Sequence, residues 1–148
     1  MPLNFLLWNC LDPGKTSCGE RGKGAALRPS GNECVLVFAV DNDSFRSRFD
    51  VKQVCDSLFF YSGQQQEPVL LLVELKGGDI AHGADQLAET LTAVRDALKQ
   101  KKLAAQYRAV LITSSRALKN AAPLQKHFEK QHGIPLAVTR NPNLRPHL

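Results

Sequence analysis

The residues best placed to do chemistry together are two acids, Asp56 and Glu74, each near one end of a mostly apolar run. The runs cover residues 54–61 and 69–76, and a polar turn with three glutamines separates them. An antiparallel pairing centred on Gln65 places the two acids opposite each other on one face, because side chains alternate along a strand. Their β-carbons would then lie about 4.5–5.5 Å apart. The spacing therefore predicts two adjoining carboxylates at the end of an apolar hairpin.

Two carboxylates this close repel each other and resist desolvation, so either a positive charge lies between them or one of them is protonated. Lys76 can supply the positive charge, because it lies two residues beyond Glu74 on the same face, about 7 Å along the strand. A divalent cation bound by both carboxylates would satisfy the pair better, and Mg²⁺ suits one or two carboxylates with several waters. The same pattern also fits a structural ion cluster in which Lys76 alone neutralises both acids.

This arrangement resembles the signature of the PD-(D/E)XK nuclease superfamily, in which an Asp on one strand precedes an acid-x-Lys on the next. Here Asp56 is followed by the glutamate-leucine-lysine segment 74–76 and then by a predicted helix that carries Gln86, similar to a glutamine in some members. Cys55 stands where the proline of the signature would be. The resemblance implies a restriction endonuclease-like core of helix, three strands, helix and strand over residues 20–115.

The resemblance also implies a role for each matching residue. Asp56 and Glu74 would bind Mg²⁺ or Mn²⁺, helped by the backbone carbonyl of Leu75. Lys76 would orient or help deprotonate the attacking water and stabilise the charge that develops on the phosphate. Gln86 would position a water or the substrate backbone. The expected activity is metal-dependent hydrolysis of phosphodiester bonds in DNA, and less readily in RNA.

Many members of the superfamily use a further glutamate from their first helix. Glu20 and Glu33 are the candidates for it, and Asp41 could join the site if its strand lies beside the first strand of the hairpin. The sequence leaves the choice among these three acids open.

Positive side chains are available to contact a nucleic-acid backbone, and such contacts give affinity that does not depend on base sequence. They are Arg46, Arg48 and Lys52 before the hairpin, and Lys99, Lys101, Lys102 and Arg108 after the long helix. The net charge of +5 and the pI of about 9.2 mildly favour a polyanionic partner as well. A homodimer would suit the cleavage of both strands of a duplex.

The elements that must position these residues follow from hydrophobic periodicity. Apolar runs predict strands at residues 35–40, 54–61, 69–76, 109–113 and 136–139. Steps of three and four residues predict an amphipathic helix over 80–103, and Asp79 is its expected N-cap. A second helix is predicted over 123–132, residues 9–34 are expected to be mostly loop, and residues 3–8 fit a short strand or a helix. The order predicts an α/β fold in which helices flank a mixed central β-sheet, as one domain over residues 1–148.

Composition excludes several classes of protein. Hydrophobic residues make up 43% of the 148 residues and charged residues 22%, which is too apolar for intrinsic disorder. Apolar runs such as Val69–Val73 are far shorter than the ~20 residues of a membrane span, so we expect no membrane partner. The chain start lacks the features of a signal peptide, and the four cysteines lack C-x-x-C spacing. We therefore expect reduced thiols and a cytoplasmic location.

Three kinds of function remain after these exclusions. The first is a metal-dependent nuclease. The second is the same fold acting as a catalytically inactive subunit for nucleic-acid binding or assembly. The third is an unrelated α/β domain with a structural ion cluster. Metal titration separates the third from the first, and cleavage assays separate the first from the second.

Overall fold

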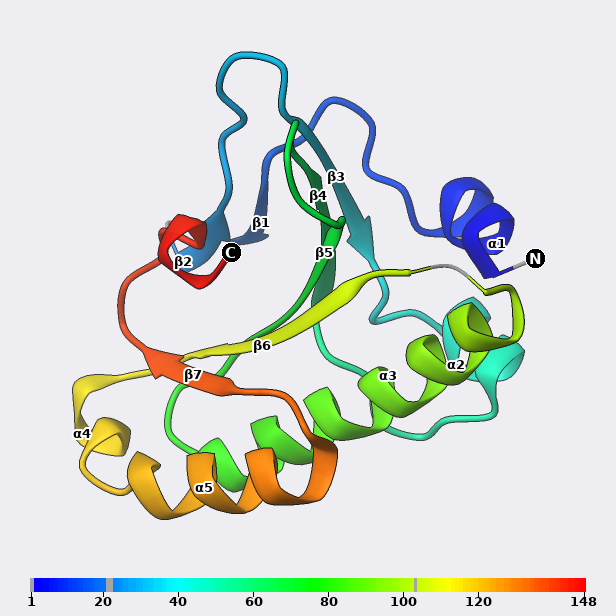
Figure 1. Ribbon diagram of the computed structural model, residues 1–148. Helices are drawn as coiled ribbons and strands as arrows, with labels where there is room; N and C mark the ends of the chain where they lie inside the picture. The colour runs from blue at the N-terminus through cyan, green and yellow to red at the C-terminus, as the bar shows by residue number, and fades with distance from the viewer. Residues whose placement is uncertain (1, 21–22, 103) are drawn as a thin grey trace.

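A five-stranded mixed sheet forms the centre of the computed structural model, which describes residues 2–20, 23–102 and 104–148 (Figure 1). The strand order is β3-β4-β5-β6-β7. The strands span Cys34–Ala39 (β3), Ser57–Ser62 (β4), Val69–Leu75 (β5), Gln106–Ile112 (β6) and Leu136–Thr139 (β7). The pairs β3–β4 and β4–β5 are antiparallel, whereas β5–β6 and β6–β7 are parallel. The predicted α/β class with a mixed central sheet is therefore confirmed.

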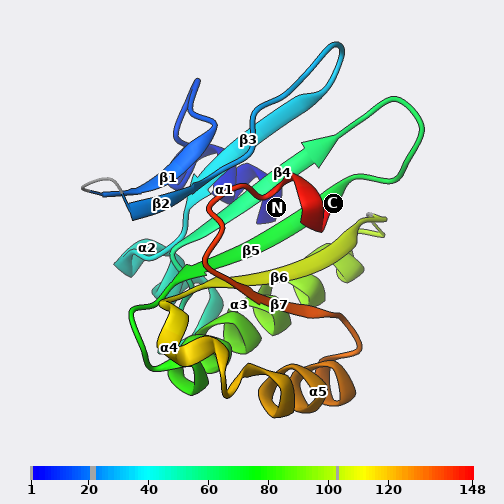
Figure 2. The same ribbon diagram turned by 90° about the vertical axis from the view of Figure 1, so that its left-hand side faces the viewer.

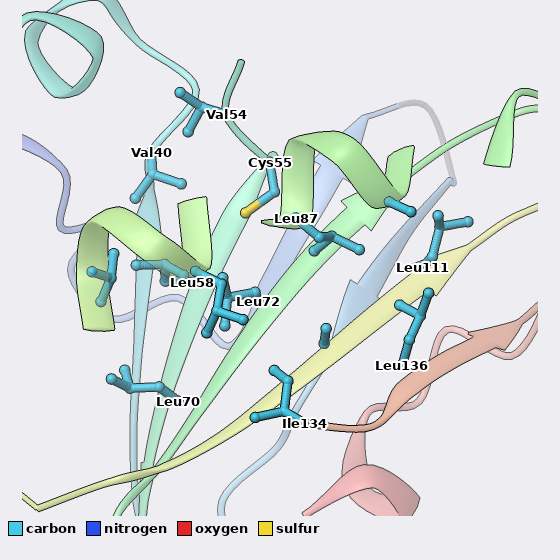
Figure 3. Packing of buried hydrophobic residues seen from close by; sticks show 14 of the residues in the cluster. Val40, Val54, Cys55, Leu58, Leu70, Leu72, Leu87, Leu111, Ile134 and Leu136 are labelled. Carbon is cyan, nitrogen blue, oxygen red and sulfur yellow. The ribbon is translucent and has the colours of Figure 1, made fainter. Parts of the chain in front are cut away.

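The two longest helices, α3 (Ile80–Gln100) and α5 (Ala121–His132), cover one face of the sheet (Figures 1 and 2). Leu87 of α3 packs there with Leu58 and Leu72 of the strands, as Figure 3 shows. The shorter helices are α1 (Pro2–Asn9), which packs against α3, and α2 (Asp43–Phe49), α4 (Ser115–Leu118) and the 3₁₀ turn η1 (Arg145–His147). Among the helices of the described residues, none has the length and apolar character needed to cross a lipid bilayer.

The opposite face of the sheet is covered by a hairpin and by the C-terminal segment (Figure 2). β1 (Ser17–Glu20) and β2 (Lys23–Ala26) form the antiparallel hairpin. Ala26 makes a parallel bridge to Asn143, and the next residue, Leu144, is fully buried. The C-terminal segment therefore closes a second apolar layer over the sheet.

Residues 10–12 lie along the outer edge of β3. The N–H of Asp12 donates to the carbonyl of Val37 at 2.9 Å, and the N–H of Ala39 donates to the carbonyl of Cys10 at 2.8 Å. These bonds satisfy backbone groups that an outer strand would otherwise expose to solvent.

The register of the β4–β5 hairpin is the predicted one. Phe60 pairs with Leu70 and Leu58 pairs with Leu72, as an alignment centred on Gln65 requires. Side chains on both faces of these strands are mostly buried, so the hairpin is internal to the sheet. This register determines which residues meet at the end of the hairpin.

Several predicted boundaries were wrong. β4 begins three residues later than predicted, and α3 ends at Gln100 rather than at 103. Residues 17–20 and 23–26 form the β1–β2 hairpin instead of a loop. The first helix before the three antiparallel strands is α1, at Pro2–Asn9. The β1–β2 strands are only four residues long and contain glycine, so local propensity gave no signal for them.

α2 occupies a segment for which no helix was predicted. The side chain of Asn42 accepts the N–H of Phe45 at 2.8 Å and forms the N-cap of the helix. Asn and Asp serve both turns and helix N-caps, so the sequence at this point was ambiguous. Phe45 is fully buried, and this packing favours the helix.

Candidate active site

Asp56 and Glu74 come together immediately beyond the last pair of the β4–β5 ladder, Ser57 with Val73. Here each carboxylate accepts a hydrogen bond from the backbone near the other. The N–H of Asp56 donates to Oε2 of Glu74 at 3.0 Å, and the N–H of Leu75 donates to Oδ2 of Asp56 at 2.7 Å. These bonds fix both side chains at one corner of the sheet, where the predicted register expects them.

Lys76 lies beside this pair and is held in place by α3. Its Nζ is 3.5 Å from Oε1 of Glu74 and donates to Oε1 of Gln86 at 2.7 Å. The amide nitrogen of Gln86 in turn donates to the carbonyl of Val54 at 3.1 Å. Gln86 therefore links the start of α3, the segment before β4 and the ammonium group. The predicted residues Asp56, Glu74, Lys76 and Gln86 all meet at this corner.

Two further residues of α3 bring the helix close to the site. The hydroxyl of Thr90 accepts the N–H of Cys55 at 2.9 Å and donates to the carbonyl of Gln86 at 2.8 Å. A Cβ added at Gly83 would lie 2.7 Å from Leu111 and 3.5 Å from Cγ of Glu74, so glycine permits the close approach. Sequence reasoning missed Thr90, although a polar residue four positions after Gln86 on the buried face of the helix was a signal.

The corner carries more negative charge than its surroundings favour. Glu74 is only 2% exposed, and burial together with the carboxylate of Asp56 raises its pKa to about 7, against the opposing effect of Lys76. Burial also raises the pKa of Asp56, and the charge of Asp41 acts in the same direction. Glu74 thus holds a proton for much of the time near neutral pH unless a cation replaces it.

The three candidates for a further acid have different surroundings. Asp41 is close enough to influence Asp56, and its carboxylate contacts the guanidinium of Arg46. Glu33 was a wrong candidate, because its carboxylate binds Arg145 at 2.7 Å on the opposite side of the sheet and accepts the hydroxyl of Tyr61 at 2.8 Å. The side chain of Glu20 lies outside the part of the chain that the structure describes.

The oxygen atoms at this corner are of the type that hard cations prefer, but they are too few to surround an ion. Within residues 2–20, 23–102 and 104–148, no three His, Cys, Asp or Glu side chains are grouped to hold a metal ion. Asp56 and Glu74 offer two carboxylates, and the carbonyl of Leu75 is the additional donor that the sequence resemblance implies. Mg²⁺ commonly binds one or two carboxylates and keeps several waters, so two carboxylates are the number of ligands that the ion implied by the resemblance would need.

The basic residues singled out in the sequence lie in two places. Arg46 is on α2, where it contacts Asp41 near the corner. Lys99 lies in the last turn of α3, thirteen residues beyond Gln86, or about 20 Å along the helix axis. Arg108 is likewise near the start of β6, at the end of the sheet away from Lys76. The second predicted basic cluster is therefore remote from the candidate site.

Comparison with known proteins assigns no family to the chain. No protein-family model, no curated protein and no solved structure matches it. The four residues at the corner of the sheet, and the elements that carry them, are therefore the basis for assigning a function.

Proposed function

We propose that this protein is a metal-dependent nuclease of the PD-(D/E)XK superfamily, which hydrolyses phosphodiester bonds in DNA and less readily in RNA. The observation that carries the proposal is the meeting of Asp56, Glu74 and Lys76 at the end of one hairpin, with Lys76 held by Gln86. The order of α1, three antiparallel-paired strands, α3 and the parallel strand β6 supports it. β1, β2 and α2 are then additions to the core.

The charge of the corner supports a divalent cation, Mg²⁺ or Mn²⁺, as the cofactor. Two carboxylates share a site with one ammonium group, and the raised pKa of Glu74 reflects an incomplete compensation of negative charge. Asp56, Glu74 and the carbonyl of Leu75 would hold the ion. When bound, the metal would act as a Lewis acid and lower the pKa of a coordinated water.

The protein's own groups would position and stabilise the reacting phosphate. The ammonium of Lys76 can donate to a phosphoryl oxygen or to the attacking water while Gln86 retains its orientation. The buried surroundings of Glu74 strengthen these electrostatic interactions, because they act in a medium of lower dielectric constant than water. Gln86 is a positioning residue, since its amide contacts Lys76 and the backbone of Val54.

The test is cleavage of plasmid DNA, linear DNA and RNA in Mn²⁺ or Mg²⁺, by the wild type and by Lys76→Ala. We expect the wild type to cleave and EDTA to stop the reaction. Lys76→Ala should lower the rate roughly a hundredfold or more, because it removes a preorganised positive charge. It should still bind Mn²⁺ in a calorimetric titration, since both carboxylates remain.

Lys126→Ala is the matched control, because Lys126 is exposed on α5 and contributes nothing to the corner. Its rate should equal that of the wild type. The proposal is wrong if the wild type cleaves none of the substrates with either metal, or if Lys76→Ala cleaves as fast as the control. Metal and DNA binding without any cleavage would identify the inactive binding subunit instead.

A further inference from the structure

A cleft of about 490 Å³ opens beside Lys76 at the carboxyl ends of the three parallel strands. Lys76 and Gly77 after β5, Thr113 and Ser114 after β6, and Arg140 after β7 are among its lining residues. Figure 2 shows these strand ends at the same edge of the sheet, next to α4. The volume is within the range of pockets that hold small organic ligands, and this edge is where open α/β sheets commonly bind them.

The chemistry of the cleft favours an anion. Its described lining contains two cations, Lys76 and Arg140, and no carboxylate. Ser114 precedes α4 without making a capping hydrogen bond, so its exposed hydroxyl is available to a ligand. A guanidinium and a hydroxyl that line one cleft are both groups that bind phosphate oxygens well.

We propose that this cleft binds a second phosphate group of the substrate strand, adjacent to the one that is cleaved, through Arg140 and Ser114. The inference rests on the proposed nuclease function and adds the direction in which the strand leaves the site. Lys76 contacts Glu74 and also lines the cleft, so it joins the metal corner to this second phosphate position. The strand then runs across the carboxyl ends of β6 and β7, and not along α3 toward Lys99.

A substitution at Gly77 offers an independent way to test whether the cleft binds the substrate. A Cβ at Gly77 would meet no atom within 4 Å, and the same is true of the neighbouring Gly78. Neither glycine has a positive φ, so a side chain adds no backbone strain at either position. Of these two glycines, Gly77 lines the cleft, whereas Gly78 is not among the described lining residues. Gly77→Leu therefore places a bulky side chain at the lining of the cleft, and Gly78→Leu is its matched control.

The experiment measures the binding of a short fluorescein-labelled DNA duplex and of its single strand by anisotropy in Ca²⁺, together with their cleavage in Mn²⁺. Arg140→Ala should weaken binding about tenfold or more, because it removes a charged hydrogen bond to phosphate. For Arg140→Ala, the slope of log affinity against log salt concentration should be smaller in magnitude by about one than for the wild type. Gly77→Leu should also weaken binding. Lys99→Ala and Gly78→Leu should remain within about twofold of the wild type, as exposed substitutions usually do.

The outcomes separate this inference from the nuclease proposal. If the wild type binds and cleaves DNA but Arg140→Ala matches Lys99→Ala in affinity and salt slope, the cleft inference is overturned and the nuclease stands. If the wild type neither binds nor cleaves, both are overturned. Equal thermal unfolding of the four variants confirms that differences in binding come from the cleft and not from loss of fold.

Discussion

Glu74 shows how a single side chain links the stability of the protein to its proposed chemistry. It is almost completely buried, it adjoins a second carboxylate, and the Nζ of Lys76 that faces it also donates to Gln86. Its pKa of about 7 is therefore well above the ordinary value of 4.5. A corner of this kind is unfavourable as a structural element alone, and the cost is expected where a site is built to bind a cation.

At the residue scale, we predict that the unfolding free energy of the metal-free protein falls as pH rises from about 4.5 to about 7. In this window Glu74 keeps its proton in the folded state and loses it in the unfolded state. The stabilisation is thus complete below the unfolded pKa and is lost as pH passes the folded pKa. At about 1.4 kcal/mol per pKa unit, the loss is roughly 3 kcal/mol. Urea denaturation in EDTA over a pH series measures it.

Glu74→Gln is the control for this pH dependence, because a glutamine cannot ionise. Its stability should change little over the same pH window, apart from a smaller contribution of the same sign from Asp56. Mn²⁺ should restore stability to the wild type at alkaline pH and have no such effect on the variant. If the unfolding free energies of the wild type and Glu74→Gln changed equally with pH, the pH dependence could not be assigned to Glu74.

The adjacency of Asp56 and Glu74 could be predicted at this scale, because strand register is simple arithmetic once the turn is located. The role of Glu33 could not. Its carboxylate binds Arg145, which is 112 residues away in the sequence, and no local pattern reports such a contact.

At the scale of elements, α3 does more than cover the sheet. Its periodicity predicted a helix starting after Asp79, and the Asp79 side chain accepts the N–H of His82 at 3.1 Å as an N-cap. Periodicity could not show that Gln86 and Thr90 use the buried face to hold Lys76 and Cys55. Those contacts depend on how the helix lies across the strands, which a one-dimensional pattern does not specify.

Thr90→Val is predicted to destabilise the protein by about 1–3 kcal/mol, because it leaves the buried N–H of Cys55 without an acceptor. Thr90→Ser keeps the hydroxyl and should retain most of that stability. Thr92→Val is the matched control, since Thr92 also donates to the carbonyl four residues earlier but is exposed. Chemical denaturation compares the three variants. If Thr90→Val and Thr92→Val lost the same amount of stability, the contact of Thr90 with Cys55 would be unimportant.

At the scale of the whole molecule, the C-terminal segment ties distant parts of the chain together. Leu144 is fully buried in a segment that pairs alongside β2, and the guanidinium of Arg145 binds Glu33 and the carbonyl of Arg28 at 2.7 Å each. Tyr61 of β4 donates to the same glutamate. No element was predicted for residues 140–148, since this segment has little regular structure and gains its order from tertiary contacts.

Leu144→Ala is therefore expected to destabilise the fold by about 2–5 kcal/mol, the range for truncation of a fully buried leucine. Leu148→Ala should cost distinctly less, because Leu148 is only partly buried against the same layer. Thermal and urea unfolding measure both. If the two substitutions have the same small effect, the C-terminal segment does not contribute to the core in solution.

The bonds from residues 10–12 to β3 also constrain self-association. An open strand edge can recruit a strand from another molecule, which leads to continuous intermolecular sheets and to aggregation. Along Val37–Ala39 that edge is already occupied by the chain itself. A second copy therefore cannot extend the sheet across this half of β3, and any homodimer would have to be assembled through another surface.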